Sequence, residues 1–93
     1  MPKFIVIHTI PKKQIEQMAE IPPEKNTMIF YARKNQNFDA YWVRSWVVPD
    51  QDKLYCEWNA KDEESIRKAW ESVKGIGIDS INEMQIIDAE DFR

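Results

Sequence analysis

The chain has 93 residues, of which 43% are hydrophobic, and its formal net charge is −3 at pH 7. This length predicts a single domain over residues 1–93 and is too short for two. The sequence has no basic stripe, which argues against nucleic acid as a partner. It also has no apolar run near the ~20 residues that cross a membrane, so we expect no membrane partner.

Cysteine content and the start of the chain predict the compartment. Cys56 is the only cysteine and cannot form an internal disulfide. The first residues lead into a strand-like segment at Phe4 rather than into a secretory signal peptide. We therefore expect a protein of the reducing cytoplasm.

The first third of the chain predicts one strand and two helical segments. Residues 4–10 form a compact apolar run that ends at Pro11, as in a buried strand. Residues 12–20 carry apolar side chains three and four positions apart, which is the helical period. Two prolines interrupt this helix, and a second helical segment is expected over residues 24–35.

The middle of the chain predicts a β-hairpin over residues 41–60. Two runs rich in aromatic and β-branched residues flank a short break that contains proline and aspartate. Both faces of both runs carry bulky side chains, so we expect something to cover each face. Three of the four tryptophans and the cysteine lie here, which makes the hairpin the centre of the predicted fold.

The last third predicts a helix, a strand and a tail. Asp62 can cap a helix over residues 62–74, and Gly75 is suited to end it in a left-handed conformation. One apolar stripe of this helix would face the sheet: Ile66, Ala69, Trp70 and Val73. A final strand is expected within residues 78–88, and residues 89–93 are expected to be a frayed tail.

These elements follow the order β-α-β-β-α-β. That order is typical of the α+β ferredoxin-like fold, in which a four-stranded antiparallel sheet has both helices on one face. The other face would be apolar and open, and such a face favours association. We therefore expect a homodimer in which two sheets pack together as a dimeric α/β barrel.

The hairpin register predicts which side chains meet. A loop over residues 49–52 places Val48 opposite Lys53, and with them Arg44 opposite Glu57. The face toward the helices would then hold Tyr41, Val43, Ser45, Val47, Leu54, Cys56, Trp58 and Ala60. The face toward a partner subunit would hold Trp42, Arg44, Trp46, Tyr55 and Glu57.

The predicted partner face contains a candidate ligand-binding site. Arg44 would lie there among Trp42, Trp46 and Tyr55, and a guanidinium beside aromatic walls can hold an anionic or planar ligand. The alternative is an interface arginine that pairs with Glu57, since Trp, Tyr and Arg are enriched at protein interfaces. We favour the interface, and a cleft at the dimer seam would be compatible with both.

Four further residues are weighed as site residues. His8 is the sole histidine, and with Cys56 it offers the imidazole and thiol that suit nickel or zinc. A tight metal site needs three or more protein ligands, so we favour a structural histidine, an inert buried thiol and no cofactor. Trp70 and Trp58 could line a pocket between helix and sheet, although an aromatic core pair is favoured.

Several short segments resemble a known family of small ferredoxin-like proteins that includes a nickel-binding dimer. The matching segments are the opening M-P-x-F with His8 on the first strand, Trp46-Val47, K-L-Y-C at residues 53–56, and Ala60 with Asp62 before the last helix. The resemblance covers most of the chain and implies the fold and the homodimer.

The same resemblance argues against nickel in this chain. Metal-binding members of the family have an aspartate two residues before the first-strand histidine, and a histidine in the last helix. Val6 and Trp70 stand at these positions here. Of the ligands that the resemblance would imply, only His8 and Cys56 remain.

Three hypotheses for function follow. The first is a non-enzymatic, dimeric protein that binds a small ligand or a metal. The second is a small cofactor-independent enzyme of the oxygenase or isomerase kind, since similar barrels host such activities. The third is a protein interaction module. The sequence has no Ser/His/Asp set, no Gly-rich phosphate loop and no close pair of carboxylates, so we favour the first.

Overall fold

The computed structural model describes residues 1–25, 36–71, 73 and 75–92. Its strands and helices are β1 (Lys3–Thr9), α1 (Lys12–Glu20), β2 (Ala40–Val48), β3 (Lys53–Ala60), α3 (Glu63–Trp70) and β4 (Ser80–Met84). Three short 3-10 helices are η1 (Pro23–Lys25), η2 (Pro49–Gln51) and η3 (Ala89–Phe92). The strands form one antiparallel sheet in the order β2-β3-β1-β4, which confirms the predicted α+β class.

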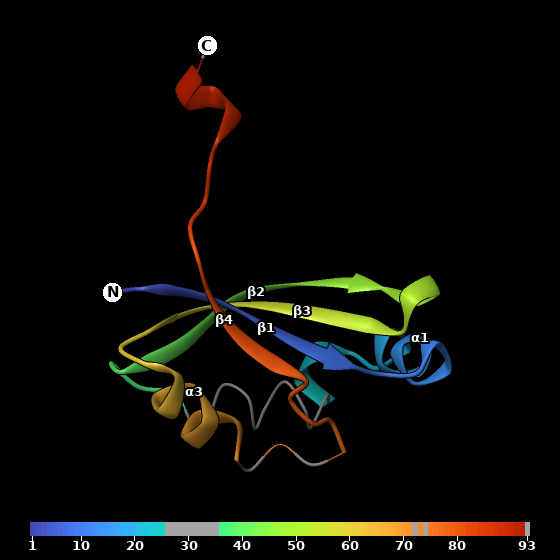
Figure 1. Ribbon diagram of the computed structural model, residues 1–93. Coiled ribbons are helices and arrows are strands. Elements are labelled where there is room, and N and C mark those ends of the chain that lie inside the picture. Colours follow the sequence, from blue (N-terminus) through green and yellow to red (C-terminus); the bar gives the residue numbers. More distant parts are fainter. Residues whose placement is uncertain (26–35, 72, 74, 93) are drawn as a thin grey trace.

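The two helices lie on the same side of the sheet (Figure 1). We call this side the helix face, and we call the opposite side, which carries Ile5, Tyr55 and Arg44, the open face. The core fills the space between the sheet and the helices. Its largest fully buried side chains are Trp58, Ile10, Ile66, His8 and Val6. No helix in the described ranges is long and apolar enough to cross a membrane.

The early elements agree with the prediction from the sequence. The strand predicted over residues 4–10 and the helix predicted over residues 12–20 are confirmed as β1 and α1. Of the helical segment predicted over residues 24–35, the structure describes η1, and residues 26–35 lie outside the described residues. Pro11 precedes α1, and the Ile15 amide donates to its carbonyl at 3.0 Å.

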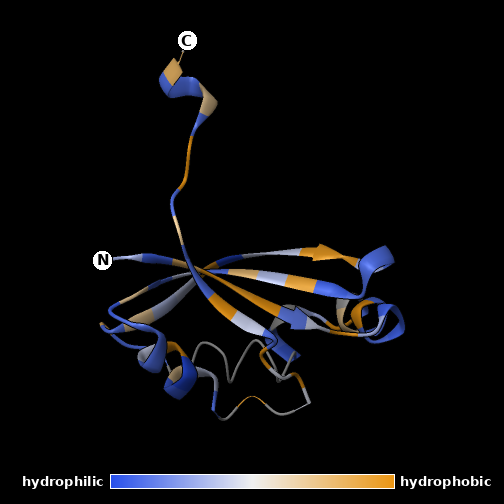
Figure 2. Cartoon of the chain, in the orientation of Figure 1, coloured by the Kyte–Doolittle hydropathy of each residue, from blue (hydrophilic) through white to orange (hydrophobic). Residues whose placement is uncertain are grey.

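The last strand is shorter than predicted. The sequence predicts it within residues 78–88, whereas β4 ends at Met84. Its partner strand β1 pairs with it only from Lys3 to Ile7, so the residues after Met84 extend past the start of β1. The chain after β4 therefore leaves the sheet (Figure 2), and Ile86 and Ile87 are largely exposed. The tail that was expected to fray forms η3.

The predicted hairpin register is confirmed. Val48 pairs with Lys53, and Arg44 pairs with Glu57. The loop between the strands is η2, and Asp52 ends it in the left-handed region with φ of 54°. Aspartate tolerates this conformation better than most residues.

A β-bulge corrects the predicted faces at the start of the hairpin. The register shifts between Trp42 and Arg44, so Val43 is the extra residue. Because of this insertion, Trp42 pairs with Trp58 and packs against the core on the helix face. Tyr41 moves to the open face instead. The prediction that Trp42 faces a partner subunit and Tyr41 the helices is therefore wrong.

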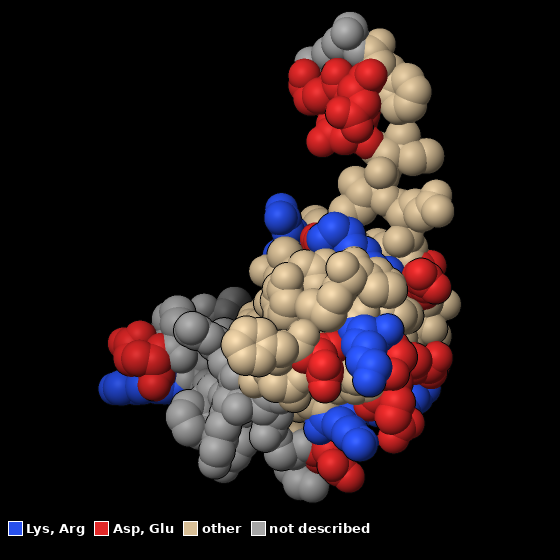
Figure 3. Space-filling view, turned by 90° about the vertical axis from the view of Figure 1, so that its left-hand side faces the viewer, with Lys and Arg blue, Asp and Glu red and all other residues tan. Residues whose placement is uncertain are grey.

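Helix α3 begins at the predicted cap. Asp62 accepts a hydrogen bond from the Ser65 amide at 2.8 Å. Acidic and basic side chains are interspersed around the solvent side of this helix (Figure 3), and Glu63 pairs with Arg67 at 2.8 Å. The helix ends at Trp70 rather than at residue 74, and residues 72 and 74 are not among those described.

Gly75 and Gly77 provide a matched test of the turn after α3. An added Cβ would meet no heavy atom within 4 Å at either position, but only Gly75 has a positive φ, of +84°. We expect Gly75→Ala to lower the free energy of unfolding by about 1–2 kcal/mol, since a side chain strains this conformation. Gly77→Ala should be neutral or slightly stabilising. Urea unfolding measures both, and equal losses would contradict the assignment of strain to Gly75.

Candidate functional site

His8 lies at the centre of the buried layer between the sheet and α3. The alternation of β1 turns it toward the helix face, where its side chain is completely buried. Its Nδ1 lies 2.6 Å from the carbonyl oxygen of Gly77. A carbonyl can only accept, so Nδ1 must donate, and the lone pair of a neutral ring is then on Nε2. Within the described part of the chain, Nε2 has no hydrogen-bond partner.

Two tryptophans extend this buried polar arrangement. The ring of Trp70 lies 4.6 Å from that of His8, centroid to centroid, and meets Trp58 edge-on at 6.5 Å. Trp70 donates its Nε1 to the carbonyl oxygen of Ile76 at 2.9 Å. The Nε1 of Trp58 is buried and finds no partner among the described residues. We call His8, Trp58 and Trp70 the histidine–tryptophan site.

The electrostatics of this site keep His8 uncharged. Burial lowers the pKa of His8 below its ordinary value of 6.5, and the hydrogen bond to Gly77 and the charge of Asp79 oppose this only in part. The neutral ring has one bonded donor and one free acceptor. The site therefore presents an acceptor at His8 Nε2 and a donor at Trp58 Nε1, with the Trp70 ring in contact with both residues.

Cys56 lies on the same sheet face but is chemically quiet. Its thiol is buried, and burial raises its pKa to about 11, so it is protonated at neutral pH. Ser45 Oγ donates to its sulfur at 3.1 Å, and Trp42 Nε1 donates to Ser45 Oγ at 2.8 Å. These bonds give the thiol a structural environment, and the protonated thiol is a poor nucleophile.

The residues present do not fit a closed nickel or zinc site. Among the residues that the structure describes, no group of three His, Cys, Asp or Glu side chains could hold a metal ion. His8 Nε2 is an open nitrogen ligand, but the Cys56 thiol is protonated. Val6 is apolar, and the Trp70 ring packs against the imidazole. A tight site needs more ligands than this arrangement supplies.

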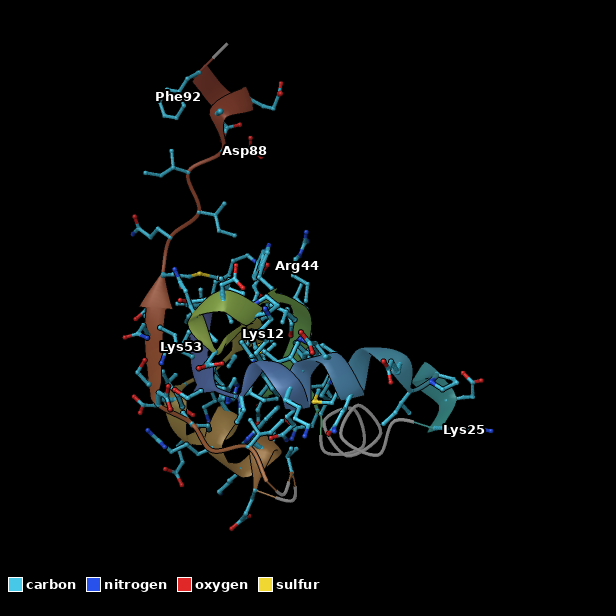
Figure 4. All side chains as sticks on the ribbon, turned by 90° about the vertical axis from the view of Figure 1, so that its right-hand side faces the viewer. Lys12, Lys25, Arg44, Lys53, Asp88 and Phe92 are labelled. Carbon is cyan, nitrogen blue, oxygen red and sulfur yellow. The ribbon has the colours of Figure 1, made fainter. Side chains whose placement is uncertain are left out.

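The open face carries a charged network centred on Glu57. Its carboxylate is 3.2 Å from Arg44 Nε and 3.1 Å from Lys3 Nζ. Lys3 also donates to Asn59 Oδ1 at 2.8 Å, and Asn59 Nδ2 donates to the Tyr41 hydroxyl at 3.0 Å. The Glu57 side chain is only 5% exposed, whereas that of Arg44 is 65% exposed and points away from the sheet (Figure 4).

The structure divides the predicted ligand-binding residues between the two faces. Arg44, Trp46, Tyr55 and Glu57 share the open face, as the register implies. Trp42 and Trp70 lie with the core on the other side, so the prediction that Trp42 shares a face with Arg44 is wrong. Sequence reasoning missed the unpartnered Trp58 nitrogen and the role of Lys3, because both depend on pairing between distant strands.

The buried Glu57 carboxylate generates a stability prediction. Lys3→Ala and Arg44→Ala should each cost less than about 1 kcal/mol, because the other cation still pairs with Glu57 and both are partly exposed. The double variant should lose several kcal/mol more than the sum, on the order of 3–5 kcal/mol, since it leaves a buried charge unpaired. Urea unfolding at fixed protein concentration measures these losses.

The same Lys3 and Arg44 variants made in a chain that carries Glu57→Gln are the control for this double-mutant cycle. Removing both cations there should be nearly harmless, because no buried charge is left without a partner. Additive losses in the wild-type background would show that Lys3 and Arg44 do not share the carboxylate.

Buried His8 predicts a pH dependence of stability. The folded state resists protonation of His8, while the unfolded chain binds that proton below about pH 6.5. The free energy of unfolding should therefore fall as the pH falls below 6.5, by at most about 1.4 kcal/mol per pH unit. His8→Asn keeps a side-chain donor but does not titrate. If it shows the same loss between pH 7 and 5 as the parent, His8 is not the source.

Comparisons with known proteins agree with this fold. A family profile described as "Nickel responsive protein SCO4226-like" matches residues 4–84. The crystal structure of SCO4226 from Streptomyces coelicolor A3(2) is similar, with a TM-score of 0.58 and 17% identity, over 92% of this chain and 99% of that one. At this identity the likeness concerns the fold alone. No curated protein matches the chain. Because the family profile covers most of the sequence, this chain belongs to the nickel-responsive SCO4226-like family.

Proposed function

We propose that this chain is a non-enzymatic, homodimeric protein that binds a small uncharged molecule at the histidine–tryptophan site. The observation that supports this most directly is a pair of buried polar atoms, His8 Nε2 and Trp58 Nε1, that find no hydrogen-bond partner among the described residues. An unsatisfied buried polar group costs about 1–3 kcal/mol, so native proteins rarely keep two without a reason. A ligand that bonds both atoms is that reason.

The chemistry of the two atoms selects the ligand class. The neutral His8 nitrogen needs a hydrogen-bond donor, and the Trp58 N–H needs an acceptor. Both lie in an apolar layer, where a charged ligand would lack a counter-ion. The ligand is therefore a small neutral molecule with a donor and an acceptor joined by an apolar stretch, such as a hydroxyketone, a diol or a small amide.

The family description raises nickel as an alternative. The family is described as nickel responsive, but the donor set of this chain argues against tight metal binding. Among the described residues, His8 offers an open nitrogen ligand but no group of three ligands surrounds it, and the Cys56 thiol is protonated. A response to nickel in relatives and the binding of an uncharged ligand here are compatible, because one fold can hold different sites.

The homodimer is the second part of the proposal. The strand order β2-β3-β1-β4 supports a ferredoxin-like arrangement, and we propose that two open faces pack together as a dimeric α/β barrel. Trp46 and Tyr41 are 46% and 39% exposed on this face. Large aromatic side chains and arginine on one surface are typical of an interface.

A binding screen tests the ligand proposal. Neutral hydroxy compounds and small amides are titrated while the fluorescence of the tryptophans is recorded. For a hit, Trp58→Phe should weaken binding about tenfold, because it removes one buried hydrogen bond and keeps a ring. Trp46→Phe, on the open face, is the matched control and should bind normally. Equal affinity for the parent and Trp58→Phe would contradict this site.

Trp58→Phe also has an expected effect without any ligand. Since the lost N–H has no partner among the described residues, this variant should lose no more than about 1 kcal/mol of stability, and that loss should come from the smaller ring. If the protein converts a compound found in the screen into a product, this would support the cofactor-independent enzyme instead of the non-enzymatic binding protein. The His8 Nε2 atom would then act as the proton acceptor.

Calorimetry with nickel and zinc tests the alternative. We expect binding that is weak and unchanged in His8→Ala, because one nitrogen ligand cannot hold these ions tightly. A stoichiometric, sub-micromolar site that His8→Ala abolishes would replace the small-molecule proposal with a metal site.

A further inference from the structure

The residues after β4 form an arm that contacts little of its own subunit. Residues 85–92, which we call the C-terminal arm, rise from the sheet on the side opposite α3 (Figure 1). Their apolar side chains are largely exposed, with Ile86 at 56% and Ile87 and Phe92 at 80%. The radius of gyration, 13.8 Å, exceeds the roughly 12 Å of a compact domain of this length.

The end of the arm has a defined local structure. In η3, the Asp91 amide donates to the Asp88 carbonyl at 3.0 Å, and the Glu90 amide donates to the Asp88 side chain at 2.9 Å. Phe92 projects at its tip (Figure 4). An apolar side chain on a short ordered turn loses less conformational freedom on docking than one on a disordered tail.

The arm and the open face complement each other in charge and in polarity. The arm carries Asp88, Glu90 and Asp91, which form the acidic cluster at its end (Figure 3). The open face offers the cations Lys3 and Arg44. It also carries half-buried apolar side chains, Ile5 and Ile7, beside exposed Trp46. Figure 4 places Arg44 on the side of the sheet from which the arm rises.

We propose that the C-terminal arm of one subunit docks on the open face of a second copy of this chain. This inference rests on the proposed homodimer and names the segment that holds it together. Ile86, Ile87 and Phe92 would pack on exposed Trp46 at the β2 edge of the partner's open face, beside the contact between the two sheets, and the acidic residues would lie near its Arg44. A second copy fits because each chain has one arm and one open face. A two-fold axis then satisfies both arms and leaves no free surface for further growth.

Light scattering of the 93-residue chain tests this exchange of arms between two subunits. The parent should be a dimer at micromolar concentration. Ile87→Asp and Phe92→Asp should each raise the dimer dissociation constant by at least about tenfold, because each places a charge where an apolar side chain docks. Gln85→Asp is the matched control, since it adds the same charge at an exposed polar position of the arm.

Isotope-filtered NMR shows which subunit the arm contacts. In a mixture of labelled and unlabelled chains, methyl groups of Ile86 and Ile87 should show cross-subunit contacts to the Trp46 indole. Contacts only within one chain would mean that the arm folds onto its own sheet, and would overturn the exchange.

The outcomes separate the two proposals. A monomeric parent would overturn the dimer and the exchange together. A dimer that is unaffected by Ile87→Asp and Phe92→Asp would overturn the exchange and leave the dimer intact. Since all three arm positions are exposed, these variants should unfold at the same urea concentration as the parent when measured at a concentration where each is monomeric.

Discussion

The central position of β1 is the constraint on which both faces of the molecule depend. β1 pairs with β3 on one side and β4 on the other, so its register is held from both edges. Its side chains alternate, with Phe4, Val6 and His8 buried against the helices. A slip of one residue would move His8 to the open face and Ile7 into the core. The same pairing brings Lys3 to Glu57. β1 therefore supplies His8 to the histidine–tryptophan site and Lys3 to the charged network of the open face.

The two faces satisfy their polar groups differently. On the open face, the buried Glu57 carboxylate is paired with two cations, and Asn59 links Lys3 to Tyr41. On the helix face, His8 and Trp58 each keep a buried polar atom without a partner in the described residues. A buried polar group that is already paired needs no further hydrogen-bond partner, whereas an unsatisfied one does. This difference is the physical basis for our proposal that a ligand binds at the helix face and a partner subunit at the open face.

Membership of a nickel-responsive family does not by itself determine the chemistry of this chain. The fold requires apolar side chains between sheet and helix, and Val6 and Trp70 both meet that requirement. With a tryptophan against the imidazole, the layer is better suited to an uncharged molecule than to an ion that needs several charged or strongly polar ligands. A shared family fold therefore does not by itself imply a shared ligand.

The sequence by itself determined the element order, the hairpin register and the cap of the last helix. Each of these depends on local signals: apolar periodicity, the loop that sets Arg44 opposite Glu57, and the side chain of Asp62. What only the tertiary structure decided depends on contacts between distant residues. The bulge at Val43 reversed the faces of Tyr41 and Trp42, since one extra residue inverts the alternation of a strand. The missing partner of Trp58 Nε1, and the end of β4 where β1 no longer pairs with it, likewise follow from how the strands and helix come together, which no local pattern encodes.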